Sequence, residues 1–422
     1  MFFTIFYASA FAQAPAEAEV GGRFYLRPQA RIHPSFNAGD RDAQVAFLFN
    51  GRGTLSLTRG AITMTLDLQS NESWGSRETT TSNDSAVGTH RAMLRARHGD
   101  ATLTAGRQTV NLHQGRYIAD PGWLPNGRSY DGLRIQHNDG SWNLDTGAYL
   151  LRPMLPAGPD RPEPSWGDWL AHASIGHTAG KALTLSGYVL LKTSSAEYAS
   201  VAQDGLNNVR LVSPDRAMYA PAVNIHWKRP LHKIAADIMG QFGKDGEQRI
   251  RAWQVAWVSS HALDVLAQPA LRFTFEQSSG DCEQTGCDDA VNSAFEPLYG
   301  KHHGLRGMAD QAYGSNLRDL AVGVGLKPDD RVSIATDVHV FSLTNPEGPW
   351  MRNGGNLQGV GSIAGNEDTL LGVESDTRIT WKPKPGVLLD TGYAWFLPQG
   401  AGRTLTGDAP QHFVYLRNVT EF

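Results

Sequence analysis

Apolar and polar side chains alternate over stretches of about ten residues along most of the chain, as strands between lipid and a watery lumen require. The clearest stretches cover residues 183–191, 332–340 and 373–381, and shorter ones cover 253–257 and 271–276. A period of two belongs to β-strands, because a helix repeats every 3.6 residues. The first stretch illustrates the two faces: Leu183, Leu185, Gly187, Val189 and Leu191 against Thr184, Ser186 and Tyr188.

The connections between these stretches alternate between short and long. Gly, Pro, Asn and Asp, which suit tight reversals, mark the short ones, and the long ones are polar. Short turns on one rim and long loops on the other are typical of an outer-membrane barrel. The tight turns lie at 59–60, 98–100, 138–140, 179–180, 328–330 and 383–386, and the long stretches at 71–90, 109–127, 153–165, 193–215, 278–312, 344–364 and 398–407.

Pairing these hairpins predicts an all-β fold, a transmembrane antiparallel up-and-down β-barrel of about eighteen strands, with short periplasmic turns and long extracellular loops. The alternation is weak at 44–58 and 216–242, which leaves sixteen strands open. The negative mean hydropathy of −0.35 is compatible with a membrane barrel, because a barrel strand shows lipid only every second residue. After the N-terminus no run of eighteen apolar residues predicts a membrane-spanning helix.

Both ends of the chain carry signals typical of exported barrels. Residues 2–12 are apolar and precede Ala12-Gln13-Ala14, a small-x-small cleavage site, so residues 1–14 are predicted to be the remnant of a signal peptide. An apolar N-terminal strand is the alternative. Residues 15–422 then form a single barrel domain, and its last strand ends in the aromatic Phe422.

The two cysteines, Cys282 and Cys287, lie five positions apart in a long polar loop. In an exported protein this spacing favours a disulfide. A metal site is the alternative, but a structural zinc site needs four ligands and no third Cys or His lies close in sequence. We expect no metal and no cofactor.

Arginine outnumbers lysine by 29 to 9. A guanidinium binds a carboxylate through two hydrogen bonds and stays charged in any environment. Arg91, Arg95 and Arg97 share a polar face opposite Ala92, Leu94 and Ala96, and Arg134 stands opposite Leu133 and Ile135. Because arginine near the lipid midplane costs about 2–4 kcal/mol, these side chains are expected to face the lumen, where such groups select anions. Alternatively they only neutralise lumen acids, of which Asp131, Asp145, Glu374 and Asp376 are the candidates.

Several segments resemble the alginate export family of outer-membrane porins. They are residues 104–108 (TAGRQ), Gly115-Arg116, 126–135 (NGRSYDGLRI), 295–310 (FEPLYGKHHGLRGMAD), 392–398 (GYAWFLP) and 413–422. The resemblance spans nearly the whole chain after residue 14 and implies an eighteen-stranded monomeric barrel with an electropositive lumen. By motif position it implies pore-lining roles for Arg107, Arg116, Arg128 and Arg134, with Asp131 as a pairing acid. It also suggests a structural role for the loop that carries His302 and His303, which would fold over the pore. A metal or catalytic role for the two histidines is the alternative, although a histidine in a surface loop is usually only solvated.

The function expected is therefore a channel of the Gram-negative outer membrane that passes alginate-like polyuronate or small acidic solutes. A general porin, or a receptor or adhesin acting through its loops, is the alternative without anion selectivity. An enzyme is disfavoured, because the chain has no Gly-x-Ser-x-Gly or His-Glu-x-x-His motif. The partners expected are outer-membrane lipid, the anionic solute and, for polymer export, periplasmic export proteins, with no nucleic acid.

Overall fold

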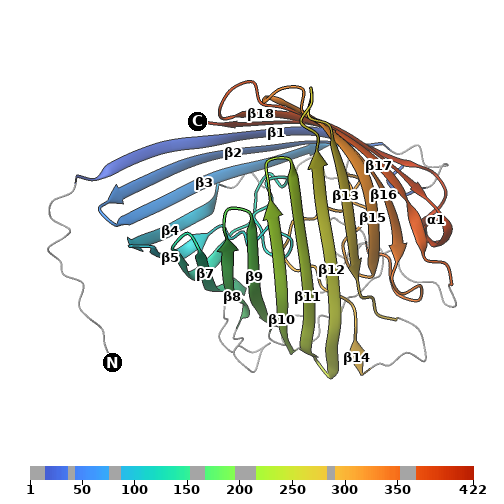
Figure 1. The fold of residues 1–422 in the computed structure, drawn as a ribbon, viewed down its shortest axis with the longest axis horizontal. Coiled ribbons are helices and arrows are strands. Elements are labelled where there is room, and N and C mark those ends of the chain that lie inside the picture. Colours follow the sequence, from blue (N-terminus) through green and yellow to red (C-terminus); the bar gives the residue numbers. More distant parts are fainter. Residues whose placement is uncertain are drawn as a thin grey trace.

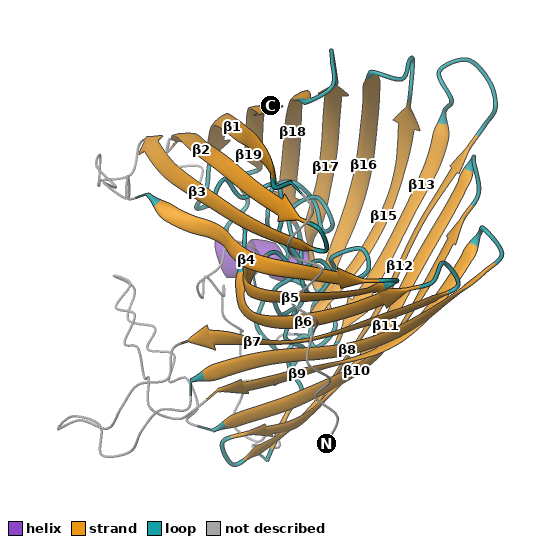
Figure 2. Cartoon of the chain, turned by 90° about the vertical axis from the view of Figure 1, so that its left-hand side faces the viewer, coloured by secondary structure: helices purple, strands orange, loops and turns teal. Residues whose placement is uncertain are grey.

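The computed structural model describes residues 15–36, 43–75, 87–152, 167–194, 215–282, 290–351 and 367–422. These residues form one sheet that closes into a barrel, because the first strand pairs with both the second and the last (Figures 1 and 2). Eighteen strands of the described chain build the wall, and every neighbouring pair in it is antiparallel. The predicted fold class is confirmed.

The wall strands in chain order are β1 (Glu17–Ile32), β2 (Ala43–Arg59), β3 (Ile62–Gly75), β4 (Gly88–His98), β5 (Ala101–Gln108), β6 (Tyr130–Asn138), β7 (Trp142–Arg152), β8 (Asp168–Ala179), β9 (Leu183–Ser194), β10 (Arg216–Lys228), β11 (His232–Asp245), β12 (Gln248–Ala262), β13 (Ala270–Ser278), β15 (Leu317–Leu326), β16 (Val332–Leu343), β17 (Leu370–Trp381), β18 (Val387–Pro398) and β19 (Gln411–Glu421). Two short elements lie in loops: β14 (Val291–Asn292) runs parallel to β12, and the helix α1 (Gly400–Thr406) joins β18 to β19. Among the described residues, no helix is long and apolar enough to cross a membrane.

The two rims differ as the sequence predicts. Each tight turn that the sequence marks joins two strands at one rim, and the strands that a long polar stretch separates end at the other rim. Where alternation is weak, residues 44–58 lie within β2 and residues 216–242 lie within the hairpin of β10 and β11, so the wall has eighteen strands and not sixteen. One connection differs: β11 and β12 are joined at the long-loop rim by a turn of only two residues, 246–247.

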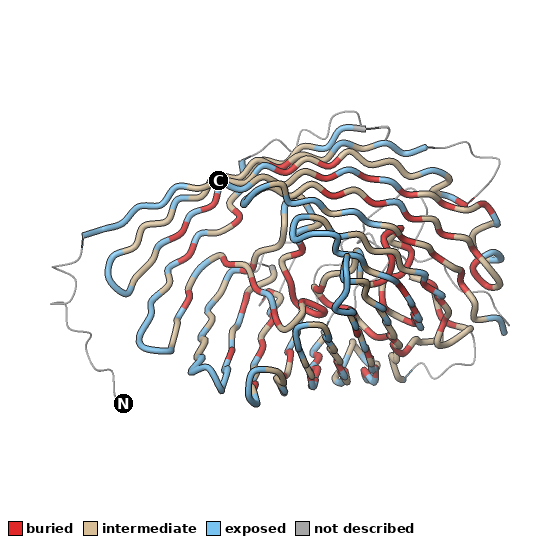
Figure 3. The backbone as a smooth tube through the Cα atoms, turned by 45° about the horizontal axis from the view of Figure 1, so that its top comes forward, coloured by how far each residue is buried: buried red, intermediate tan, exposed pale blue. Residues whose placement is uncertain are grey.

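Side chains alternate between a buried inner face and an exposed outer face along the strands (Figure 3). The large apolar side chains on the outer face, such as Leu133 (57% exposed) and Ile238 (55% exposed), form the surface that lipid covers. The stretches at 183–191, 332–340 and 373–381 show the two faces predicted for them.

The interior is filled by polar side chains and by loop segments (Figure 2). Two buried apolar clusters hold these segments against the wall. One joins Val110, Ile118 and Phe295 to wall residues of β6 to β12, and the other joins Met308 and Trp350 to wall residues of β15 to β19. The lumen is therefore narrowed from within by residues 109–129 and 290–316.

Candidate functional site

The two infolded loops are hydrogen-bonded to each other. Ile118 and Tyr299 form a parallel bridge, in which Ala119 N donates to Tyr299 O (3.1 Å) and Tyr299 N donates to Tyr117 O (2.9 Å). Lys301 N extends the contact by donating to Gly115 O at 2.8 Å. The backbones run so close that a Cβ on Gly300 would lie 1.7 Å from Arg116 O, so only glycine fits there. The loop segments 109–129 and 290–316 therefore constrict the lumen as one unit.

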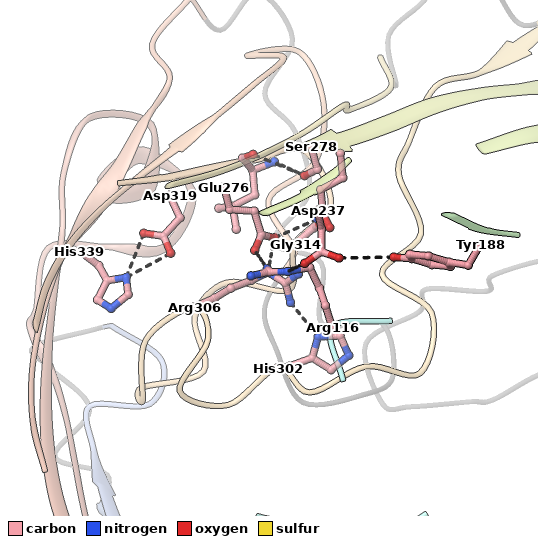
Figure 4. Close-up of polar contacts among 12 residues, drawn as sticks. Arg116, Tyr188, Asp237, Glu276, Ser278, His302, Arg306, Gly314, Asp319 and His339 are labelled. Carbon is pink, nitrogen blue, oxygen red and sulfur yellow. Dashed lines mark hydrogen bonds and ion pairs between the residues drawn. The ribbon is translucent and has the colours of Figure 1, made fainter. Parts of the chain in front are cut away.

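A buried ion-pair network ties this unit to the wall (Figure 4). Arg116 pairs with Glu276 of β13 and lies 3.4 Å from the carboxylate of Asp237 on β11. Arg306, from the second loop, donates its Nε to the same Glu276 at 2.5 Å, and Gln254 adds a hydrogen bond of 2.9 Å. All these side chains are buried, where a charge without a partner is strongly destabilising. Arg116 is thus an anchor of the constriction.

His302 completes the network from the loop side. Arg306 Nη1 donates to His302 Nδ1 at 3.0 Å, which requires an unprotonated acceptor nitrogen. Burial, and next the charges of Arg306 and Arg128, lower the pKa of His302 to about 3. Burial also lowers the pKa of the neighbouring His303, whose Nδ1 lies 3.0 Å from Asp310 Oδ1. Both histidines lie on the infolded loop, inside the barrel, and not on a solvated surface loop.

Acid is expected to loosen the constriction through His302. A loop released into water carries this histidine at its ordinary pKa of 6.5, and the folded loop holds it at about 3. Between these values the released state binds more protons, so the stability of the constricted state falls as pH falls from about 6.5 to 3. Single-channel recordings should become noisier at pH 4 than at pH 7.5, and less so in His302→Gln, whose amide oxygen still accepts from Arg306. Equal noise at both pH values in the unmodified chain would contradict this expectation.

A second anchor uses carboxylates of β17. Glu374 accepts the backbone N–H of Ala309 at 2.7 Å, and Asp376 accepts that of Met308 at 2.9 Å. Gly307 has φ +77°, and a Cβ there would lie 2.3 Å from Glu374 Oε1, so the close approach depends on glycine. Within the described chain neither carboxylate pairs with an arginine, and the suggestion that these two acids neutralise lumen arginines is wrong. They hold the loop segment 290–316 against the wall.

A row of three arginines runs up the inner face of β1. Arg23, Arg27 and Arg31 are spaced by four residues, which is about 13 Å per step along a strand. Arg23 is directly opposite Arg52 of β2 on the same inner face, a pairing of like charges that is destabilising without an anion between them. Among the described residues no carboxylate lies within ion-pair distance of Arg23, Arg27 or Arg52. Only Arg31 has a carboxylate near, that of Asp310 at 3.7 Å.

Trp123 at the tip of the first infolded loop faces this row. The Arg27 guanidinium lies 3.6 Å from the centroid of its ring, and the His303 ring stacks on it at 3.5 Å. Tyr25 and Arg27 both donate to its carbonyl oxygen, at 2.8 and 2.6 Å. The cation–π contact and the hydrogen bonds fix the guanidinium in place without neutralising it.

A cavity of about 700 Å³ extends from this point to the rim of tight turns. Gly122 and Arg417 line it next to Arg23, and the turn residues supply further cations. Arg417 shares the single carboxylate of Asp390 with Arg378, so the trio keeps one positive charge in excess. The charged residues of the lining are Arg23, Arg331, Lys382, Lys384, Arg417 and Glu421.

The other arginines that the sequence singles out take several roles. Arg91, Arg95 and Arg97 lie on the inner face of β4, and Arg91 forms an ion pair with the buried Asp67. Arg134 makes a bidentate contact with Asp145, which is the neutralising role considered for it. Arg128 bonds through its side chain to Tyr299 O, and its backbone N–H donates to Asp120.

Arg107 and Asp131 do not line the pore, contrary to their motif position. They pair with each other at 2.6 and 2.7 Å, 42% and 48% exposed, on the face of the sheet that Leu133 and Ile135 share. The alternation of β6 places Tyr130 and Arg134 inside and therefore Asp131 outside. This pair is self-neutralised on the outer surface of the barrel.

Cys282 is disulfide-bonded, and the described residues contain no free cysteine. Cys287 lies outside the described residues, so its pairing with Cys282 stays a prediction. The described residues contain no group of three or more His, Cys, Asp or Glu side chains that could hold a metal ion.

The comparisons with known proteins agree with this architecture. The alginate export family model matches residues 87–414. The chain belongs to the alginate export family. No curated protein sequence matches this family member, but solved structures do. The crystal structure of the outer membrane protein opdK from Pseudomonas aeruginosa is 11% identical, covers 96% of this chain and 99% of its own, and has a TM-score of 0.60.

Two further Pseudomonas aeruginosa structures show the same fold. OccD3 (OpdP) is 13% identical over 96% of this chain and 91% of its own, with a TM-score of 0.56. OpdK with vanillate is 10% identical over 96% and 98%, with a TM-score of 0.58. The family and the fold together identify an outer-membrane channel of a Gram-negative bacterium.

Proposed function

We propose that this alginate export family channel passes small anionic solutes, carboxylates in particular, along the inner arginines of β1 and β2. The observation that carries the proposal is the row Arg23, Arg27 and Arg31 with Arg52 opposite, of which three have no acid partner in the described chain. Cations that the fold holds in place without neutralising them attract anions from solution.

The proposed path carries cations along its whole length. From the long-loop side a solute would meet Arg31, then Arg27 against Trp123, then Arg23 and Arg52, and finally the cations of the 700 Å³ cavity. A planar carboxylate accepts two bonds from a guanidinium, and each step of about 13 Å allows transfer to the next cation. Weak binding at several sites in sequence favours conduction over trapping.

The infolded loop segments favour small solutes over a polymer, because 109–129 and 290–316 are hydrogen-bonded to each other and bound to the wall. A uronate monomer carries the same carboxylate as an alginate chain and needs far less room. The structure titled OpdK with vanillate contains a small aromatic carboxylate in a barrel of the same fold, which supports this choice of probe.

The test is a planar-bilayer recording of the purified full chain under a KCl gradient. The reversal potential should show preference for chloride over potassium, and millimolar monouronate should reduce the chloride current. Block by oligouronate and not by monouronate would assign the channel to the polymer. A cation-preferring channel would refute the proposal, and a closed one would favour a receptor or adhesin.

A further inference from the structure

Three cations lie together on the outer face of the β11–β12 hairpin, at the long-loop rim. Lys244 of β11 is directly opposite Arg249 of β12, and Arg251 follows Arg249 on the same face. All three are exposed. Directly opposite residues have Cβ atoms about 5 Å apart and diagonal ones about 7–8 Å, so the three charges form one compact patch. We call Lys244, Arg249 and Arg251 the rim cations.

The rim cations have no acidic partner among the described residues. In the described part of the chain no carboxylate lies within ion-pair distance of any of them. Like charges directly opposite each other in a sheet are destabilising, so the arrangement is favourable only with an external anion. The outward pair Arg107–Asp131 shows the contrast, since there the chain supplies its own acid.

The outer surface below the rim cations is first aromatic and then apolar toward the middle of the barrel. Directly opposite Arg251 stands Phe242, which stacks on Tyr219 with centroids 5.6 Å apart, and the 41% exposed Trp253 follows Arg251 on the same face. Further toward the mid-barrel the face is apolar, with Ile238 and Val223 at least half exposed. Aromatic rings mark the boundary between hydrocarbon and headgroups in outer-membrane barrels. The rim cations therefore lie at the height of the lipid headgroups.

We propose that Lys244, Arg249 and Arg251 bind the phosphate groups of the phosphorylated glycolipid that forms the outer leaflet around the barrel. Long loops face the cell exterior, so the rim cations meet that leaflet. Its phosphates supply the missing anions, and its acyl chains lie along the aromatic and apolar surface below. The patch faces away from the lumen, so a solute in the pore does not reach it.

The decisive experiment measures lipid A binding to the full chain in detergent micelles, by native mass spectrometry and by displacement of a fluorescent lipid A. The variant carries Lys244→Gln, Arg249→Gln and Arg251→Gln, and the matched control carries Arg107→Gln with Asp131→Asn on the same outer surface. The triple variant is expected to bind bisphosphorylated lipid A at least tenfold more weakly than the control. Dephosphorylated lipid A should bind the unmodified chain, the triple variant and the control with equal affinity.

Unchanged single-channel conductance will show that the triple variant is folded. If the triple variant does not fold, the single variants Lys244→Gln and Arg251→Gln replace it, and each is expected to lose less lipid A affinity. Equal lipid A affinity in variant and control would overturn the proposal. Displacement by inorganic phosphate at concentrations equal to those of lipid A would overturn it too, because the patch would then be a site for free phosphate.

Discussion

Replacing Arg116 with methionine is expected to widen the pore and so raise its single-channel conductance several-fold. The same change should destabilise the protein by about 3–5 kcal/mol, the usual effect of breaking a buried ion pair. Arg116 is the only residue of loop 109–129 in the described network that reaches both Glu276 and Asp237. Its loss leaves Asp237 without an arginine partner among the described residues and removes the ion pairs that tie loop 109–129 to the wall. Single-channel conductance and urea unfolding followed by tryptophan fluorescence measure the two effects.

The matched control is Arg107→Met, which removes the same side chain from an Arg–Asp pair that is exposed. Exposed pairs contribute about 0–1 kcal/mol, and this one lies outside the lumen. Conductance should be unchanged and unfolding should shift only slightly. If both variants lowered stability equally while leaving conductance unchanged, the assignment of Arg116 as an anchor would be wrong.

The barrel was accessible from sequence because its determinants are local. Alternation needs only neighbours, so it placed Leu185 and Ser186 on the correct faces and Arg95 inside. Turn chemistry is equally local, which is why Gly60 and Gly140 mark real reversals. The row Arg23, Arg27 and Arg31 was also within reach, since residues four apart on a strand share a face.

The placement of Arg107 and Asp131 shows where motif position misleads. The alternation that puts Arg134 inside, opposite Leu133 and Ile135, also puts Asp131 outside with these two apolar residues. A motif fixes which residues recur, and the strand register decides which side of the wall they occupy. The register, applied to the whole motif, would have separated the outward pair from the lumen arginines.

The contacts that hold the constriction could not be predicted from the sequence, for a different reason. Arg116 meets Glu276 across 160 positions, and Gly307 meets Glu374 across 67, so no local pattern indicates either contact. A long polar segment reads the same whether it extends into solvent or folds into the barrel. Only the closed wall decides the direction, because the carboxylates of Glu276, Glu374 and Asp376 on its inner face bind the loop residues.

Replacing Arg23, Arg27 and Arg52 with glutamine is expected to abolish most of the anion preference. At an effective dielectric constant of about 20, a unit charge about 8 Å from a cation gains about 2 kcal/mol, which raises the local anion concentration more than tenfold. The chloride-to-potassium permeability ratio, from reversal potentials under a KCl gradient, should therefore fall at least tenfold, and monouronate block should weaken with it.

The triple variant of Lys244, Arg249 and Arg251 is the natural control, because it removes three positive charges from the outer face of the same barrel. Its permeability ratio should equal that of the unmodified channel at physiological salt, where charges beyond about 8 Å are largely screened. A fall of the same size in both triple variants would mean that net charge, and not the inner arginines, sets the selectivity. An unchanged ratio in the Arg23, Arg27 and Arg52 variant would remove these residues from the solute path.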